Sequence, residues 1–346
     1  MRYLTFRDNC IFFWNPGLEA VWGAISLLGG QRGHSLCTEI YGEEQIALWQ
    51  RQYRFLFETF QAIRGHADMN MLDLLLDMDL STLSRQAYAD AVLATPAAEF
   101  LWRILSPDFY CPEADVEVLR RAVNGDDDAL DTAYGWVAEQ CGSFLSFSAL
   151  LRQFPRFVRD FFALCDEMDD RRLEAALERY AGRVDTLARE LTDAGDPDPL
   201  VLSERLMGKR FRNRGPYDTF CFAPSLLMPV SACRFFHIQG GDMRQILFLT
   251  LRKTRREQED TVRALKAMAD PTRYQILTLL ASEGPMRGMD ISRHMGIAAS
   301  TVSHHMEQMK PLITEEPVKN AKFYGLSAVA ARELLEDIAE DLRIQR

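Results

Sequence analysis

The segment between residues 261 and 326 constrains the fold of this chain more than any other part of the sequence. It alternates short apolar helical patterns with turn-forming residues. In TVRALKAMADPTRYQILTLLAS, Asp270 stands before Pro271, which places a favoured capping residue ahead of a favoured first helical residue. The apolar residues that follow predict a buried helix, and Gly284 predicts its end.

Two more short helices and a hairpin follow in the same segment. RGMDISRHMGI predicts a helix that ends at Gly296, and ASTVSHHMEQMK predicts another that ends before Pro311. LITEEPV and KFYGLS then flank KNA, as two strands flank a tight turn. Short tandem helices followed by a hairpin predict a winged helix-turn-helix, a fold that places the helix before its hairpin in the major groove of DNA.

A family resemblance supports this prediction. LKAMADPTRYQILTLLASEG, together with STVSHHMEQM and the hairpin, closely resembles the ArsR-type family of winged-helix repressors over residues 261–327. The resemblance implies a DNA-binding transcriptional regulator that acts as a homodimer on double-stranded DNA. It does not extend to residues 1–250.

The metal ligands of the metal-sensing members of that family are missing here. Those members carry a cysteine pair before the recognition helix, where this chain has GPMRGMDIS, and the last cysteine is Cys233. Other members use His on the last helix, and ARELLEDIAEDLRIQR contains none. Because soft and borderline metals need thiolate or imidazole ligands, we expect no metal site and no cofactor. We interpret Met286 and Met289 as core-filling residues.

Two further positions depart from the family pattern. Ala298 stands where the family often has a capping Ser, so we expect Ser300 to cap the recognition helix and to start it two residues later. The first wing strand carries Glu315 and Glu316, which puts a strong contact between the wing and phosphate in doubt, although Lys319 and Lys322 remain.

The histidines of ASTVSHHM lie on a helix with two different faces. Val302, Met306 and Met309 share one face, which we expect to pack on the core. The opposite face carries hydroxyl, amide and imidazole side chains that donate to or accept from base edges. His305 borders the buried face, so we interpret it as a packing histidine with satisfied hydrogen bonds. Adjacent histidines diverge by about 100 degrees on a helix and therefore do not bind one metal together.

The predicted DNA contacts are Ser300, Thr301, Ser303, His304, Gln308, Lys319, Lys322 and Arg293. Each has an alternative interpretation. For the helix residues the alternative is an ordinary solvated face, and Arg293, like Arg287, equally suits a surface ion pair.

The first 250 residues indicate a mostly helical domain. EEQIALWQRQYRFLFETFQAI predicts one long helix over residues 43–63, and residues 2–7 with the apolar runs between 215 and 251 favour strands of a small sheet. The predicted fold class is therefore mostly α. It comprises a large helical α+β domain over residues 1–250, a charged linker over 251–260, and a winged helix-turn-helix with a terminal helix over 261–346.

The terminal helix carries an apolar stripe formed by Val329, Leu334, Leu335, Ile338 and Leu342. Two roles remain open for this stripe. It faces the partner in a homodimer, or it packs within its own domain.

Charge and composition limit the class of protein. The net charge is −10, yet residues 252–325 carry 12 Lys and Arg against 9 Asp and Glu, and the rest carries 28 against 41. A locally basic C-terminal part on an acidic protein is compatible with a DNA partner. The sequence has neither an apolar run of membrane-spanning length nor a signal peptide, so we expect a soluble cytoplasmic protein with no membrane partner. Its seven scattered cysteines indicate reduced, mostly buried thiols.

The sequence leaves the role of residues 1–250 open. They form a sensor domain for a small-molecule effector, an assembly domain that fixes the dimer, or an enzyme or protein-interaction domain fused to the DNA-binding module. No catalytic spacing is present, so we do not expect an enzyme. The predicted function is that of a sequence-specific transcriptional regulator, and more specifically a repressor.

Overall fold

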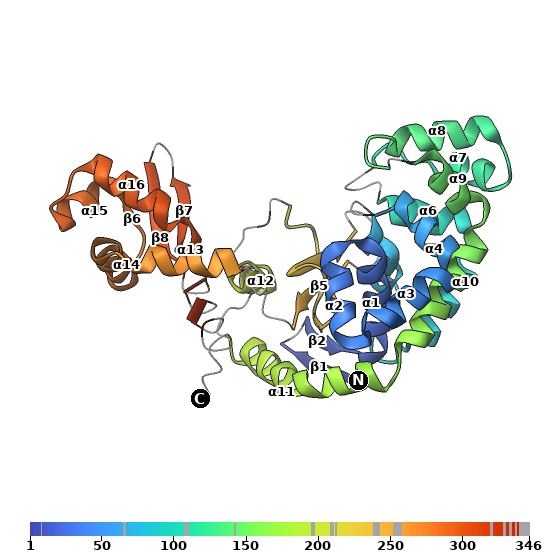
Figure 1. Cartoon of the computed structure of the whole chain (residues 1–346), viewed down its shortest axis with the longest axis horizontal. Coiled ribbons are helices and arrows are strands. Elements are labelled where there is room, and N and C mark those ends of the chain that lie inside the picture. The colour runs from blue at the N-terminus through green and yellow to red at the C-terminus, as the bar shows by residue number, and fades with distance from the viewer. Residues whose placement is uncertain are drawn as a thin grey trace. The chain divides into compact units, whose positions relative to one another are not determined.

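The computed structural model divides into two compact units, shown in Figure 1. The N-terminal unit contains Met1–Ser203 and Phe211–Leu251, and the C-terminal unit contains Glu204–Arg210 and Arg252–Arg346. The structure describes residues 1–7, 9–64, 67–106, 111–141, 143–194, 198–207, 211, 213–237, 243–251, 258–318, 321–327, 330, 331, 334, 335 and 338, without the side chains of 31–35, 258–260, 316–318 and 321. No helix within these ranges is long and apolar enough to cross a membrane.

A mixed sheet joins the beginning of the N-terminal unit to its end. The strands are β1 (Arg2–Phe6), β2 (Cys10–Trp14), β3 (Thr219–Ser225), β4 (Ala232–Phe236) and β5 (Arg244–Thr250). Their order is β1-β2-β3-β5-β4, with β2, β3 and β5 parallel and both edge strands antiparallel to their neighbours. The predicted small sheet is confirmed. β2 escaped prediction because CIFFW is buried along nearly its whole length and so lacks polar alternation.

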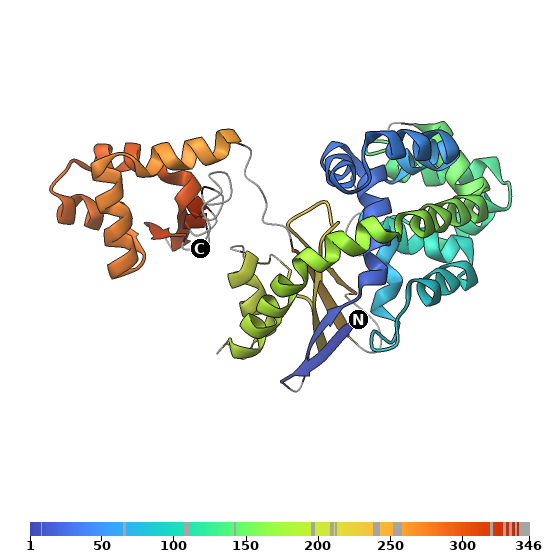
Figure 2. The ribbon, with the colours of Figure 1, turned by 60° about the horizontal axis from the view of Figure 1, so that its bottom comes forward.

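Helices make up most of the N-terminal unit. They are η1 (Pro16–Leu18), α1 (Glu19–Gly29), α2 (Gln31–Tyr41), α3 (Glu43–Gln52), α4 (Arg54–Thr59), η2 (Phe60–Ala62), η3 (Asp68–Leu76), α5 (Arg85–Ala94), α6 (Ala97–Leu105), α7 (Val116–Val123), α8 (Asp127–Val137), α9 (Phe144–Arg152), α10 (Phe154–Met168) and α11 (Arg171–Asp193). A further helix, α12 (Pro199–Met207), begins in this unit, and its residues from Glu204 on belong to the C-terminal unit. Trp22 of α1 packs on Phe248 of β5 with ring centroids 5.0 Å apart. Figure 2 shows α11 lying across the sheet.

The long helix predicted over residues 43–63 is wrong in one respect. The apolar face is buried as predicted, but the helix breaks at Tyr53 into α3 and α4. Near this break, three side chains donate to the carboxylate of Glu167 on α10, namely Trp49 at 2.7 Å, Gln52 at 2.6 Å and Tyr53 at 2.6 Å. Contacts between distant segments do not appear in the periodicity of the sequence, so the break at Tyr53 was not predicted.

A buried carboxylate fastens α1 to the end of β3. Glu19 is 1% exposed and accepts the backbone N–H groups of Leu226 and Leu227 at 2.9–3.0 Å, as well as the hydroxyl of Ser225 at 3.0 Å. Burial raises the pKa of Glu19 to about 7, although these hydrogen bonds favour the ionised form. The connection therefore holds α1 on the sheet through a polar contact inside the core.

The C-terminal unit has the predicted order of short helices and wing strands. Its elements are α13 (Gln258–Met268), α14 (Pro271–Glu283), β6 (Met286–Arg287), α15 (Gly288–Met295), α16 (Ala299–Met309), η4 (Lys310–Leu312), β7 (Ile313–Val318) and β8 (Ala321–Leu326). The strands pair in the order β6-β8-β7 (Figure 1). One core joins the helices to the wing, built around Ile276, Leu280, Ile291, Val302, Met306, Met309 and Leu312.

The described part of the terminal helix favours packing within the domain. Leu334 is fully buried in the core of the C-terminal unit, and Ile338 packs against that core. Leu335, in contrast, is 60% exposed. Val329 and Leu342 lie outside the described residues. The predicted stripe is therefore divided, and only Leu335 of its described members is left for a partner.

Candidate nucleic-acid interface

The cap of α14 sets the start of the helical core. The carboxylate of Asp270 accepts the N–H of Arg273 at 2.9 Å, and Pro271 is the first helical residue, as predicted. That backbone hydrogen bond lowers the pKa of Asp270, with smaller contributions from the charges of Arg273 and His305. The cap therefore fixes the start of α14.

The turn between α15 and α16 fixes the direction of the recognition helix. Gly296 follows α15 with φ of +65°, a conformation that glycine adopts without strain. The hydroxyl of Ser292 donates to the carbonyl of Ile297 at 2.6 Å, and the N–H of Ile297 donates to the carbonyl of Ser292 at 3.2 Å. These bonds close the turn, so α16 leaves it in a defined orientation.

Helix α16 has the two faces that its sequence predicts. Val302, Met306 and Met309 are buried. The helix candidates for DNA contact are all exposed: Ser300, Thr301, Ser303, His304 and Gln308. Ser303 is partly engaged, because its hydroxyl donates to the carbonyl of Ala299 at 3.1 Å. The exposed face therefore presents hydroxyl, imidazole and amide side chains, and none of these candidates is a Lys or an Arg.

The predicted cap of α16 is wrong. The helix begins at Ala299, Ala298 occupies the capping position, and no side chain caps its first turn. Ser300 is instead an exposed residue of that first turn. The closed turn before α16 fixes where the helix starts, so a side-chain cap is not required.

The adjacent histidines occupy different environments. Their ring centroids lie 6.2 Å apart and the rings are tilted by 58°. His304 is exposed, whereas His305 is half-buried, as expected for a packing histidine. The expectation of satisfied hydrogen bonds is wrong, because the buried Nδ1 of His305 has no hydrogen-bond partner within the described part of the chain.

Within the wing, Glu315 compensates the charge of Lys322. The ammonium of Lys322 lies 2.8 Å from the carboxylate of Glu315, and this hydrogen bond raises the pKa of Lys322. The two residues belong to opposite strands, where Glu315 faces Tyr324 in the register. They are therefore diagonal neighbours, and such pairs are within reach of long side chains. Lys319 lies outside the described residues.

Two exposed arginines lie on neighbouring elements, Arg287 on β6 and Arg293 on α15. Arg293 pairs with Asp290 at 3.2 Å on the surface, which is its alternative interpretation. Because exposed pairs are weak, this pair does not prevent the guanidinium from turning to a phosphate. Arg287 is not among the predicted contacts, yet its exposed guanidinium lies 5.0 Å from the ring centre of Phe323 on β8. The β6–β8 pairing places it there, and no sequence motif signals that pairing.

Met286 and Met289, both interpreted as core-filling residues, differ in burial. Met286 packs against the core, as predicted, whereas Met289 is 66% exposed, so its interpretation is wrong. Met289 lies on the outer side of α15, while Ile291 of that helix is buried. Within the described ranges, no three His, Cys, Asp or Glu side chains come together in a way that suits a metal ion.

Comparisons with known proteins give one family match and one similar solved structure. Residues 270–312 match the family model described as bacterial regulatory protein, arsR family. The solved homodimeric winged helix-turn-helix DNA-binding domain of a possible ArsR-family transcriptional regulator from Mycobacterium bovis is similar, with 25% identity and a TM-score of 0.21. The match covers 25% of this chain and 83% of that one. No curated protein matches the chain. The C-terminal unit is a DNA-binding module of the kind that transcriptional regulators use.

Proposed function

We propose that this chain, whose residues 270–312 form an ArsR-type helix-turn-helix, binds specific double-stranded DNA as a homodimer and represses transcription. The observation that carries the proposal is the exposed polar face of α16 opposite its buried apolar face. A helix that packs on one side and presents hydroxyl, imidazole and amide groups on the other suits the major groove.

The side chains of α16 suggest a division of contacts. Ser300, Thr301, His304 and Gln308 offer donors and acceptors to base edges. Arg293 offers positive charge to phosphates, which positions the protein without selecting a sequence, and Lys322 offers less because Glu315 compensates its charge. Lys319 belongs to the same proposed phosphate-contacting set.

Dimerisation follows from the size of the site. One recognition helix contacts only a few base pairs, and two-fold symmetry places a second helix about 34 Å away, one turn of DNA further on. Apolar side chains remain exposed on helices that flank the DNA-binding core, since Val262 is 42%, Leu265 40% and Leu335 60% exposed. Covering them in a homodimer removes apolar surface from water.

Selection of binding sites from a random DNA pool by the full chain tests this function. We expect a two-fold symmetric site whose halves are separated by about one helical turn. Light scattering on the purified complex is expected to give two chains per site. A pool that shows no enrichment, or a chain that stays monomeric with and without the selected DNA, contradicts the proposal.

The N-terminal unit is proposed to sense a small-molecule effector or to fix the geometry of the dimer. In vitro transcription from a promoter that contains the selected site tests the sign of regulation, because a repressor lowers the transcript level. Activation by the purified chain contradicts the repressor role while leaving DNA binding intact.

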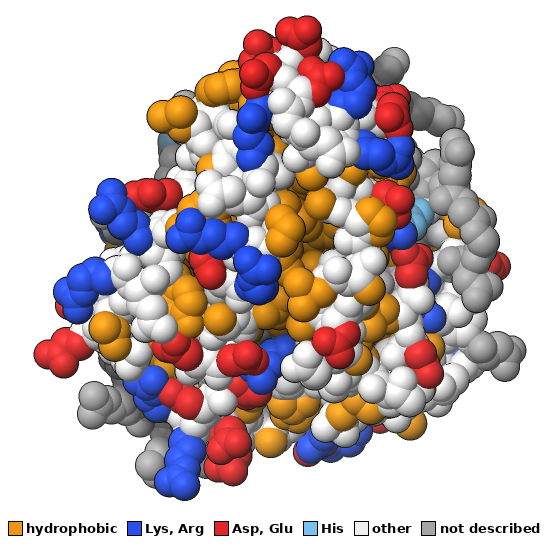
Figure 3. Space-filling view, turned by 90° about the vertical axis from the view of Figure 1, so that its right-hand side faces the viewer, with side chains coloured by type: hydrophobic (Ala, Val, Ile, Leu, Met, Phe, Trp, Pro, Cys, Tyr) orange, Lys and Arg blue, Asp and Glu red, His pale blue; other side chains and the backbone are white. Residues whose placement is uncertain are grey.

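A protein-interaction role for the N-terminal unit is the second candidate. Figure 3 shows hydrophobic side chains gathered in a hollow on one face of this unit. Its helices also leave Leu93, Trp102, Phe144 and Leu145 exposed. Apolar surface of this kind often marks an interface. Cross-linking of the chain in cells, followed by identification of attached proteins, distinguishes this candidate from the sensor.

A further inference from the structure

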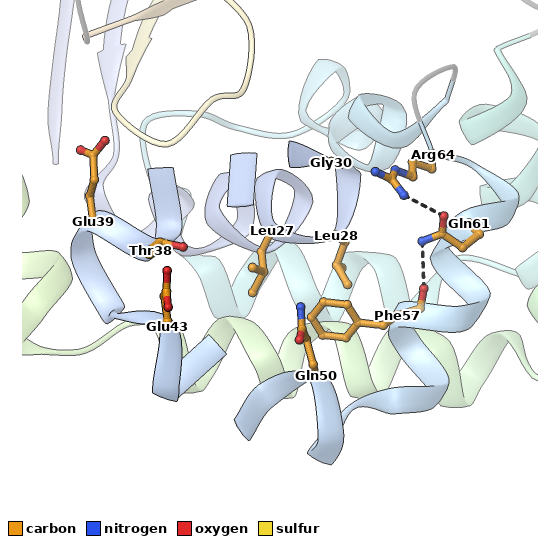
Figure 4. A pocket seen from close by; sticks show the side chains of 10 residues that line it. All are labelled: Leu27, Leu28, Gly30, Thr38, Glu39, Glu43, Gln50, Phe57, Gln61 and Arg64. Carbon is orange, nitrogen blue, oxygen red and sulfur yellow. Dashed lines mark hydrogen bonds between the residues drawn. The ribbon is translucent and has the colours of Figure 1, made fainter. Parts of the chain in front are cut away.

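A groove on the N-terminal unit has the size of a small-molecule site. Its volume is about 570 Å³, and residues of α1, α2, α3, α4 and η2 line it (Figure 4). Ligand pockets usually enclose about 300–1,000 Å³. The groove lies entirely within one unit, so it needs no second part of the chain to complete it.

The middle of the groove is lined by three apolar side chains and by the amide of Gln50 (Figure 4). Leu27 and Leu28 come from the last turns of α1, and Phe57 of α4 lies across from them (Figure 4). The leucines are buried parts of the core, and Phe57 is half-buried. An apolar group placed here displaces water mainly from Phe57, because Leu27 and Leu28 are only 4% and 3% exposed, and this displacement favours binding.

The two ends of the groove carry opposite charges. Glu39 lies in the last turn of α2 and Glu43 is the first residue of α3, and the short connection through Gly42 keeps both carboxylates at one end (Figure 4). Arg64 lies at the other end, where it donates to the carbonyl of Gly29 at 2.9 Å and to the side-chain oxygen of Gln61 at 3.0 Å. These bonds hold the guanidinium beside the apolar middle.

We propose that this groove binds a small, elongated zwitterion with an apolar centre. Its ammonium group lies at Glu39 and Glu43, its apolar part covers Leu27, Leu28 and Phe57, and its carboxylate lies at Arg64. Short apolar peptides with free termini have this chemistry. The effect of such a ligand on DNA rests on the proposed function, whereas binding itself does not.

Three related peptides test the proposal on the full chain by isothermal titration calorimetry. Trileucine carries both terminal charges, N-acetyl-trileucine lacks the positive one, and trileucine amide lacks the negative one. We expect trileucine to bind one site per chain and each blocked peptide to bind about tenfold more weakly or worse, because charge-assisted hydrogen bonds are the stronger ones. Equal binding of all three peptides, or binding of none, overturns the proposal.

Variants assign each charge to its end of the groove. Glu39→Gln combined with Glu43→Gln should remove the preference for trileucine over its N-acetyl form, and Arg64→Gln should remove the preference over the amide. Glu44→Gln and Arg51→Gln are matched controls, since both residues are exposed on α3 and neither lines the groove. Thermal melts confirm that the variants fold. Preferences that survive in the groove variants, or that disappear in the controls, contradict the assignment.

A second readout separates the groove from the proposed regulatory role. Fluorescence anisotropy with the selected DNA, with and without trileucine, measures coupling between the ligand and DNA. Binding in the groove with altered DNA affinity supports both proposals. Binding in the groove with unchanged DNA affinity supports the ligand site and contradicts the sensor role.

Discussion

The recognition helix and the wing differ in how their polar side chains are engaged. The side chains of Thr301, His304 and Gln308 on α16 make no hydrogen bond within the part of the chain that the structure describes, and all three are exposed. In the wing, Lys322 is held by Glu315 at 2.8 Å. One element therefore keeps its polar groups available to a partner, and the other pairs a cation with a carboxylate of the neighbouring strand.

This difference bears on how DNA is bound. Phosphate contacts by cations give affinity for any sequence and a strong dependence on salt, whereas contacts with base edges give sequence preference. A wing that pairs its own lysine contributes less to general affinity. We therefore expect discrimination between sequences to depend mainly on α16.

The largest expected effect comes from the buried face of α16. Met306→Ala removes a side chain that is 1% exposed, and should lower the free energy of unfolding of the C-terminal unit by about 2–5 kcal/mol. Denaturant unfolding followed by circular dichroism measures this loss. Gln308→Ala, on the exposed face of the same helix, is the control and should change stability by less than about 0.5 kcal/mol. Equal losses in both variants would remove the distinction between the two faces.

The cap of α14 should give a smaller effect that depends on pH. Because the pKa of Asp270 is lowered in the folded protein, its ionised carboxylate stabilises the fold above its unfolded pKa of about 4, and this stability disappears as the pH falls through the lowered value. Asp270→Ala should reduce the melting temperature at pH 7. Asp270→Asn should keep most of the cap at pH 7 and lose the acid dependence. Identical pH profiles for Asp270→Asn and the parent chain contradict this role.

The wing should respond in opposite directions to two substitutions. Glu315→Gln leaves Lys322 without its carboxylate partner, so DNA of any sequence should bind more tightly and the salt slope should steepen by about 0.9. Lys322→Ala should weaken binding only slightly, because its charge is already compensated. Anisotropy titrations over a series of salt concentrations measure both slopes. A strong loss in Lys322→Ala without a gain in Glu315→Gln would show that the wing contacts phosphate despite the pair.

Metal should have no effect on either element. The described residues bring no set of three metal-ligating side chains together, and the family's cysteine pair is replaced by GPMRGMDIS. Added zinc or a chelator should therefore leave the affinity for DNA unchanged. A reproducible shift in affinity with stoichiometric bound zinc overturns this expectation.

The sequence predicted local features better than it predicted contacts between distant segments. The Asp270 cap, the Gly296 turn and the buried face of α16 follow from residue types at fixed spacing, and all three are present. The start of α16 was misplaced because a closed turn, not a serine cap, determines it.

The misses have a common physical origin. The break at Tyr53 accompanies its contact with Glu167, more than a hundred residues away, and the Lys322–Glu315 pair depends on strand register. The groove between Glu43 and Arg64 likewise depends on how α1 to α4 pack together. Interactions of this kind leave no periodic signal in the sequence. The DNA contacts of α16 and the wing remain predictions.

The most direct test of the central claim compares specific with random DNA at one salt concentration. The parent chain, Thr301→Ala, His304→Ala and Lys322→Ala are each titrated with the selected site and with a scrambled duplex of equal length. Thr301→Ala and His304→Ala should each lose about 1–3 kcal/mol on the selected site while keeping their affinity for the scrambled duplex. Lys322→Ala should change both affinities equally and only slightly. If Thr301→Ala and His304→Ala bind both duplexes as the parent does, α16 does not select the sequence and the account is wrong.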